Sequence, residues 1–468
     1  MANAANTLEQ MGLSRKVIII NAIMIFGGFI GILNQTLLTP ALPSIMKEMQ
    51  VDASTAQWLT TGYMLVNGIM VPVTAFLIDK FTTRRLFFAA MGIFSLGTLT
   101  AAISGDFSIV LLARVLQAAG AGIMMPMGQV LMLLTVPKQY RGTGMGMIGI
   151  VMGAAPCIGP VVAGVVIDAF NWHMLFFGLT PLALLTIVIA WFYLDNFGSP
   201  KDVQLDITSV VLSTLGFGGL LYGFSVIGSS GFSVVVLASL LIGAVSLALF
   251  IRRQLHMETP LLKMHLLKNR TFAISVILVM LVNAALIVGG ILMPIYVQTI
   301  RGFSATMSSL IMLPSALVSA LMSPISGRLF DKHGARKLAV PGLFIIITAS
   351  FMLTRLTETT PLFYVGLVYC FRMLGLSFIN MPLNTWGLNS LENSVMSHGT
   401  AIGNTFRQVA SSLGTALLIT VMSLTIAFAP DPASSAAQIS GINNAYLGGT
   451  LMMVAALVLT VIFVKEEK

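Results

Sequence analysis

Three adjacent polar side chains, Asn34, Gln35 and Thr36, lie inside an apolar run of the chain, GILNQTLLTPALPSI (31–45). Amide and hydroxyl groups can bind a ligand or a neighbouring helix, but an amide does not take up and release a proton at physiological pH. At about 100° per residue the triplet covers about 200° of a helix surface, so the three side chains cannot share one cavity. We expect Asn34 and Gln35 to face a ligand cavity, and Thr36 to hydrogen-bond its own backbone beside Pro40.

Two arginines also lie inside apolar runs. Arg114 comes about six residues into the run 108–134, and Arg372 holds a comparable place in the run 361–388. A charge inside a bilayer is costly unless it is paired or hydrated, so each arginine either faces a ligand cavity or binds neighbouring carbonyls in a structural role. Aromatic and amide groups can contact amphipathic ligands without fixed charge matching. The candidate cavity residues are therefore Asn34, Gln35, Tyr63, Arg114, Gln117, Arg372, Asn384 and Trp386.

The composition places these residues in a helical membrane protein. The chain has 468 residues, of which 57% are hydrophobic and only 9% are charged, whereas soluble domains carry about 25% charged residues. Apolar runs recur that are long enough for a helix to cross about 30 Å of hydrocarbon. The alternating segments of about ten residues that outer-membrane barrels need are not seen. The predicted fold class is an all-α polytopic membrane protein, with the lipid bilayer as its surroundings.

Charged or Pro/Gly-rich stretches divide the chain into fourteen predicted spans. They lie near residues 16–40, 55–77, 86–103, 108–134, 142–167, 174–193, 207–227, 232–251, 271–298, 304–327, 338–354, 361–388, 398–428 and 443–464. An even number of spans puts both termini on one side. With both termini in the cytoplasm, nineteen lysines and arginines of the loops lie inside, and only Lys47, Arg301 and Arg355 lie outside, which is the bias that sets membrane orientation. Topology thus explains most of the net charge of +9, and no nucleic-acid partner is expected.

Two loops on the predicted cytoplasmic side repeat one pattern. AFLIDKFTTRRL (75–86) aligns with GRLFDKHGARKL (327–338) at an offset of 252 residues, which corresponds to about eight helices with their loops. Two six-helix halves separated by an inserted helix pair give this spacing, and duplicated halves are typical of secondary transporters. We expect the halves at 1–195 and 271–468, with two linker helices and a loop in 196–270. We expect the repeated charges to gate transport through ion pairs that form and break. These charges are Asp79, Arg84, Arg85, Asp331, Arg336 and Lys337.

The repeated loops resemble the signature G-x-L-x-D-x-x-G-R-K of the major facilitator superfamily. The first copy departs from it at Ala75 and Thr82, where the pattern has glycine. GAAPCIGPVVAG (153–164) resembles the fifth-helix motif A-P-x-x-G-P-x-x-G-G of the drug:proton antiporter branch, with Ala163 in place of one glycine. With fourteen spans the chain is similar to that branch over almost its whole length, and most similar to its lincomycin and multidrug efflux group. The resemblance implies exchange through a bendable, closely packed helix that contains Pro156, Gly159, Pro160 and Gly164.

The first-helix motif of this branch, L-D-x-T-x-V-N-x-A-L-P, is altered at one position. The chain reads LNQTLLTPALP, so Asn34 stands where the resembled branch has an aspartate. A buried carboxyl can carry a proton, and an amide cannot. Three hypotheses remain: Asp79 or Asp168 carries the coupling proton, the substrate itself carries charge, or transport is facilitative.

The sequence and the resemblance together predict an exporter in the inner or plasma membrane. We expect a monomer that exchanges amphipathic drugs or antibiotics for protons. Export of an endogenous metabolite or lipid-like compound, without proton coupling, is the alternative. A sensor would need a soluble output domain, and the loop at about 252–270 has no room for one; a channel would not need duplicated gating loops. No phosphate-loop motif, Ser/His/Asp set or His/Cys cluster indicates ATP use, an enzyme, a cofactor or a metal.

Overall fold

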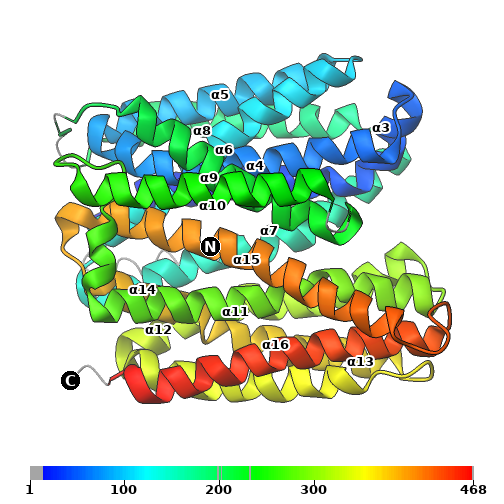
Figure 1. Cartoon of the computed structure of the whole chain (residues 1–468). Helices are drawn as coiled ribbons and strands as arrows, with labels where there is room; N and C mark the ends of the chain where they lie inside the picture. The colour runs from blue at the N-terminus through cyan, green and yellow to red at the C-terminus, as the bar shows by residue number, and fades with distance from the viewer. Residues whose placement is uncertain (1–13, 198–199, 202, 231–232, 466–468) are drawn as a thin grey trace. The chain divides into compact units, whose positions relative to one another are not determined.

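The computed structural model of the chain describes residues 14–197, 200–201, 203–230 and 233–465 (Figure 1). Within these ranges every regular element is a helix, and thirteen helices are long and apolar enough to cross a membrane. One of them, α12 (Ala305–Met352), has 48 residues and carries two of the predicted spans. The helices therefore account for all fourteen predicted spans, and the predicted fold class is confirmed.

The N-terminal part of the chain consists of long helices joined by short helical turns. The long helices are α2 (Arg15–Leu37), α4 (Ala53–Lys80), α5 (Thr83–Ile103), α6 (Phe107–Thr135), α7 (Arg141–Ala169), α8 (His173–Tyr193), α9 (Ile207–Ser230) and α10 (Val234–His256). The short elements are η1 (Thr39–Ala41), α3 (Leu42–Met49), η2 (Lys138–Tyr140) and η3 (Met264–Lys268).

The C-terminal part has the same character. After α11 (Arg270–Pro294) and the π-helical turn η4 (Ile295–Ile300), its elements are α12, η5 (Leu353–Arg355), α13 (Leu362–Ser377), α14 (Asn380–Asn389), η6 (Asn393–Val395), α15 (Met396–Ala427) and α16 (Ser435–Phe463). Pro294 ends α11 next to the π turn, as expected where a proline removes a backbone donor and crowds the preceding turn.

The chain forms two compact units. Unit 1 contains residues up to Gly218 together with Gly243–Met264 and Glu392–Thr405; unit 2 contains Gly219–Ile242, His265–Leu391 and Phe406–Lys468. The first turns of α15 therefore belong to unit 1. The boundaries predicted at residues 195 and 270 remain a prediction.

In unit 1, α2 and α6 occupy the centre of the packing. Helix α6 packs against α2, α4 and α5, and α2 packs also against α7 and α8. Their contacts bury an apolar core that includes Met24, Phe87, Phe94, Met124 and Phe176. A core between central helices fixes the direction of every polar side chain that points inward from them.

In unit 2, α12 packs against α13, α14 and α16, and α11 packs against α14 and α16. One core includes Leu278, Leu343, Ile346 and Trp386, and a second includes Met293, Tyr296 and Tyr369. Trp386 is 5% exposed and lies within the first of these cores.

Prolines interrupt two of the predicted spans. Helix α2 ends at Leu37, and the segment continues through η1, with Pro40 at its start, into α3. The predicted span 361–388 is likewise two helices, because α13 ends at Ser377 and α14 begins at Asn380, two residues before Pro382. A proline ring crowds the carbonyl four residues earlier, here that of Phe378, and the helix breaks between these two residues.

The two repeated loops turn in different ways. Gly334 interrupts α12 with φ 79° and ψ 174°, a conformation open almost exclusively to glycine. The equivalent residue in the first copy, Thr82, has φ −64° and ψ 147°, and its hydroxyl accepts a hydrogen bond from the Arg85 amide. An extended residue with a capping hydroxyl begins a helix without glycine, so the departure from the family signature at Thr82 has a structural explanation.

Candidate functional site

A buried polar network joins three helices of unit 1. Asn34 lies on α2, Tyr63 on α4, and Arg114 and Gln117 on α6. Residues three apart share a helix face, so Arg114 and Gln117 point together toward α2. The exposed fraction is 0% for Asn34, Arg114 and Gln117 and 1% for Tyr63. Four of the candidate cavity residues are thus brought together in a closed interior.

Amide and guanidinium hydrogen bonds hold the network. Arg114 Nη1 donates to Gln117 Oε1 at 2.8 Å and to Asn34 Oδ1 at 3.2 Å. Arg114 Nε donates to the Leu59 carbonyl at 3.2 Å. The amide of Asn34 donates to Gln117 Oε1 at 3.0 Å, and Gln117 Nε2 donates to the Thr98 hydroxyl at 3.3 Å. Arg114 therefore binds both a carbonyl, as the structural alternative requires, and the two amides that are candidates for ligand contact.

No carboxylate of the described residues forms an ion pair with Arg114. Its Cζ lies 4.2 Å from the centre of the Tyr63 ring, a cation–π contact, and the Tyr63 hydroxyl donates to the Gly31 carbonyl at 2.9 Å. The Nη2 atom of Arg114 is buried without a hydrogen-bond partner. Since Asn34 offers only an amide oxygen, this part of unit 1 encloses a positive charge that no acid among the described residues neutralises.

The other two members of the polar triplet, Gln35 and Thr36, form no hydrogen bond with this network among the described residues. Gln35 is half-buried. The Thr36 hydroxyl lies 3.0 Å from the Leu33 carbonyl of its own helix and 3.3 Å from the Ala155 carbonyl of α7. The predicted backbone bond of Thr36 is confirmed, and its second contact binds the neighbouring helix α7.

A second buried arginine lies in unit 2. Arg372, on α13, is 1% exposed; its Nε donates to the Ser350 hydroxyl at 3.2 Å and its Nη2 to the Ala285 carbonyl at 3.0 Å. Its Cζ lies 5.6 Å and 5.9 Å from the ring centres of Tyr369 and Tyr446. Arg372 thus resembles Arg114 in being held by carbonyls, hydroxyls and aromatic rings. Neither of the other candidates of this unit, half-buried Asn384 and core residue Trp386, shares a hydrogen bond with it.

The first loop carboxylate, Asp79, is the centre of a second polar cluster of unit 1. It is 9% exposed and lies at the end of α4. Lys201 Nζ lies 2.7 Å from Oδ2, His398 Nε2 lies 3.3 Å from Oδ2, and the Ser397 hydroxyl donates to Oδ1 at 2.8 Å. Ser397 and His398 open helix α15, where the partial positive charge of a helix N-terminus favours an anion. Asp79 therefore binds the start of α15 and the segment that follows α8.

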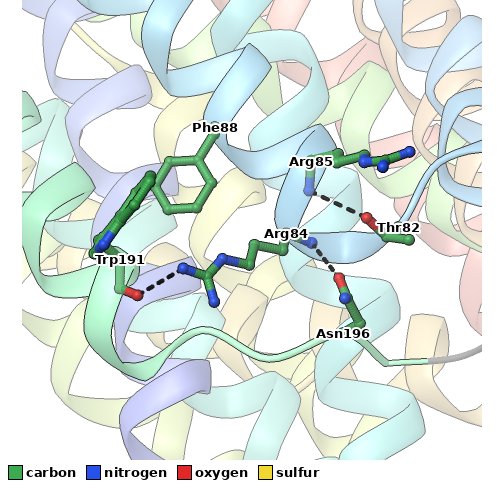
Figure 2. Close-up of a pocket in the computed structure, with 6 residues that line it drawn as sticks. All are labelled: Thr82, Arg84, Arg85, Phe88, Trp191 and Asn196. Atoms are coloured by element: carbon green, nitrogen blue, oxygen red, sulfur yellow. Dashed lines mark hydrogen bonds between the residues drawn. The ribbon is translucent and has the colours of Figure 1, made fainter.

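Of the two basic residues of the same loop, Arg84 and Arg85, the first is bound by the end of α8. Arg84 Nη2 donates to the Trp191 carbonyl at 2.9 Å, and its guanidinium lies 5.3 Å from the Trp191 ring and 5.7 Å from the Phe88 ring. Figure 2 shows this side chain in an open hollow of about 590 Å³ between α5 and the end of α8, with the Arg85 guanidinium directed to the opposite side. Ion pairs join Asp79 to Lys201 and His398 rather than to either arginine.

The remaining charged candidates are more exposed. In unit 2, Asp331 and Arg336 are half-buried near the break at Gly334, and Lys337 is exposed beside a hollow of about 290 Å³. Asp168 is exposed in the last turn of α7. Asp168 is therefore in contact with solvent, whereas the network around Arg114 is fully buried.

Helix α7 contains the four residues of the predicted exchange motif. A Cβ atom on Gly159 would lie 2.1 Å from Thr36 Oγ1, so only glycine permits this approach of α7 to α2. A Cβ on Gly164 would meet nothing within 4 Å, while Pro156 is exposed and Pro160 is half-buried. The close contact expected from this motif is therefore made by Gly159.

Three partners of Asp79 were missed by sequence reasoning, namely Lys201, Ser397 and His398. They lie 122, 318 and 319 residues beyond Asp79, and no local spacing connects them. A basic residue after α8 and a Ser-His pair at a helix start were visible signals, since helix N-termini attract carboxylates.

Comparisons with known proteins agree with this architecture. The family model of the Major Facilitator Superfamily matches residues 24–415. The chain is 43% identical to the uncharacterized MFS-type transporter YcnB of Bacillus subtilis, over 99% of this chain and 98% of that protein. It is 36% identical to the lincomycin resistance protein LmrB of Listeria monocytogenes, over 96% of both chains. In fold it is similar to the human organic anion transporter MFSD10, with a TM-score of 0.66 at 12% identity, over 96% of this chain and the whole of that one.

Proposed function

The chain belongs to the Major Facilitator Superfamily and is a multi-pass cell-membrane transporter of small molecules, and from this premise we propose that it exports amphipathic drugs or antibiotics in exchange for protons. The observation that carries the proposal is its 36% identity to a lincomycin resistance protein along 96% of both chains. The close α2–α7 contact at Gly159 supports it, because exchange needs a helix interface that transmits motion between tightly packed neighbours.

We propose that Asp79 stabilises one conformation of the transport cycle. Its carboxylate accepts hydrogen bonds from Lys201 and Ser397 and pairs with His398, so neutralising it removes charge-assisted contacts to two segments distant in the sequence. Contacts of this type contribute about 1.5–3 kcal/mol each, enough to shift a two-state equilibrium by tenfold or more.

The coupling step needs a group other than Asn34. Of the two acids predicted from the sequence, Asp79 is buried among partners that respond to its charge, whereas Asp168 is exposed. We therefore favour Asp79 on the cytoplasmic side. A proton on this carboxyl would cancel the attraction to Lys201 and to the N-terminus of α15.

Transport itself can be tested in inside-out vesicles from a drug-sensitive bacterium that expresses the chain. Lincomycin and a panel of amphipathic cations and neutral antibiotics are screened first by growth inhibition, and the protective hits are then followed as uptake into acidified vesicles. We expect uptake that collapses when the pH gradient is dissipated. Flux indifferent to the gradient would remove proton antiport, and a strain with no altered drug sensitivity would favour an endogenous substrate.

The role of Asp79 is tested in the same vesicles. We expect Asp79→Asn to reduce uptake about tenfold, as the loss of one charge-assisted contact implies. Asp195→Asn is the matched control, because Asp195 forms an exposed ion pair with Lys16 on the same predicted side. Equal uptake by both variants would contradict the proposed role.

A further inference from the structure

Glu48, Trp172 and His173 form a compact group on the predicted external side of unit 1. Glu48 lies on α3, Trp172 directly precedes α8, and His173 is its first residue. The indole Nε1 of Trp172 donates to Glu48 Oε2 at 2.7 Å, and His173 Nε2 lies 3.0 Å from Glu48 Oε1. The other ring nitrogen of His173, Nδ1, lies 3.1 Å from the Ala102 carbonyl of α5. The imidazole is thus held between two oxygen atoms.

The hydrogen-bond chemistry of this arrangement requires a bound proton. A carbonyl can only accept, so Nδ1 of His173 carries a hydrogen toward Ala102. The contact between Nε2 and Glu48 Oε1 then needs one further proton, carried by either the imidazole or the carboxyl group. Without it, lone pairs would face each other across 3.0 Å. The observed geometry therefore corresponds to a protonated Glu48–His173 pair.

The surroundings place an aromatic face against the imidazole and leave the pair accessible to water. The Trp172 and His173 rings stack with centres 3.7 Å apart and an interplanar angle of 29°, and an aromatic face stabilises a cation. Trp172 is fully buried, whereas the side chains of His173 and Glu48 are 18% and 46% exposed. The rigid indole positions the pair, and external water can deliver or remove its proton.

Other charged groups on the neighbouring elements do not replace Glu48. Lys47 precedes it on α3 and is exposed, and Asp168 is exposed at the end of α7. Asp106 accepts hydrogen bonds from two backbone amides at the start of α6. Among the described residues, Glu48 is the group that forms an ion pair with His173.

We propose that Glu48, Trp172 and His173 form an external proton-loading site of the transporter. A proton taken from outside joins α3 to α8 and α5 through this pair, and its release separates Glu48 from His173. The inference rests on the proposed proton-coupled export and deepens it. It supplies a titratable group on the external side. This group lies on α3, which follows the helix that carries Asn34, and Asn34 itself cannot titrate.

Proton binding can be measured without transport. The chain has four tryptophans, so replacing Trp58, Trp191 and Trp386 by phenylalanine leaves Trp172 as the single fluorophore. A charged imidazole stacked on an indole quenches its fluorescence, and we expect the emission of Trp172 in purified protein to fall reversibly as pH is lowered. The pH step should vanish in His173→Gln and His173→Arg and shift in Glu48→Gln. His256→Gln is the control, since His256 is exposed and bonds the Arg252 carbonyl of its own helix.

Transport by the His173→Arg and His256→Gln variants, made in the chain that keeps all four tryptophans, tests the coupling. His173→Arg keeps a permanent cation opposite Glu48, so the contact between the two residues is retained at every pH. Uptake driven by the pH gradient should therefore fall about tenfold, which is the factor that one charge-assisted contact contributes. The His256→Gln control should keep wild-type uptake. Membrane insertion and a monodisperse elution profile establish that each variant is folded.

The outcomes separate this inference from the proposed function. A Trp172 pH step that persists unchanged in His173→Gln would overturn the proton site. A step that is lost, together with wild-type gradient dependence in His173→Arg, would overturn its role in coupling. Wild-type flux indifferent to any pH gradient would instead refute proton antiport, and with it the loading role, while leaving proton binding at this pair established.

Discussion

At the scale of residues, the chain keeps a buried arginine and lacks the acid expected beside it. Arg114 is bound by Asn34, Gln117 and a backbone carbonyl and lies against Tyr63, all nearly inaccessible to solvent. Burying an unpaired charge is expensive, so such an arrangement persists only where each remaining contact is well placed. The network is therefore sensitive to any change in the charge of Asn34.

Asn34→Asp should stabilise the folded protein at neutral pH. The new carboxylate would lie about where Asn34 Oδ1 lies, 3.2 Å from Arg114 Nη1, and a hydrogen bond between charged groups contributes about 1.5–3 kcal/mol. We expect a higher melting temperature in detergent at pH 7, measured by intrinsic fluorescence.

Asn21→Asp is the matched control for this change. Asn21 is 4% exposed on the same helix, and its amide donates to the Thr135 hydroxyl and the Val17 carbonyl, with no arginine bound. A carboxylate there gains no cation and should destabilise the protein. Equal destabilisation by both substitutions would show that Arg114 does not act as an unpaired charge.

At the scale of elements, a close approach of α7 to α2 depends on one glycine. Gly159→Ala would place a methyl group 2.1 Å from the Thr36 hydroxyl oxygen, and overpacking of this kind costs about 1–3 kcal/mol. We expect a lower melting temperature and slower uptake, with partial recovery when Thr36→Ala is added. Gly178→Ala, at a position where a Cβ meets nothing within 4 Å, should be neutral; a similar loss there would argue against steric contact as the cause.

An ion pair at the ends of α9 and α10 predicts a defined pH dependence. Hydrogen bonds from Arg253 at 2.7 and 3.0 Å lower the pKa of Asp206 to about 2. A carboxyl with a lowered pKa stabilises the folded state above its unfolded value of about 3.9, and this contribution is lost as pH falls toward 2. Because Arg253 is 41% exposed, the effect is small. Asp206→Asn should lower the melting temperature by about 1–2 °C at pH 7 and by less at pH 3. A difference that grows on acidification would contradict this assignment.

The elements show which parts of the fold the sequence could predict. Hydropathy located every span, because a run of apolar residues has no other stable state in a bilayer. It did not locate the break before Pro382, because the apolar composition of the predicted span continues across that break. Local spacing connected Arg114 to Gln117, but the partners of Asp79 depend on tertiary packing between distant segments.

At the scale of the whole molecule, the distribution of lysine and arginine predicts that both termini are cytoplasmic. A green fluorescent protein fused after Lys468 folds to its fluorescent form in the cytoplasm, so we expect bright cells. Alkaline phosphatase fused at the same position should be inactive. The opposite pair of results would reverse the orientation and place the Glu48–His173 pair on the inner side.

The uncompensated charge of Arg114 has an electrical consequence. When alternating access moves the aqueous boundary from one side of this charge to the other, the charge crosses part of the transmembrane voltage even if the side chain itself hardly moves. One elementary charge crossing the full voltage is worth about 2.3 kcal/mol per 100 mV. With the pH gradient clamped, turnover should therefore change with diffusion potentials set by potassium and valinomycin. Asn34→Asp places a carboxylate beside Arg114 and neutralises its charge, so this variant should show a weaker dependence on the potential.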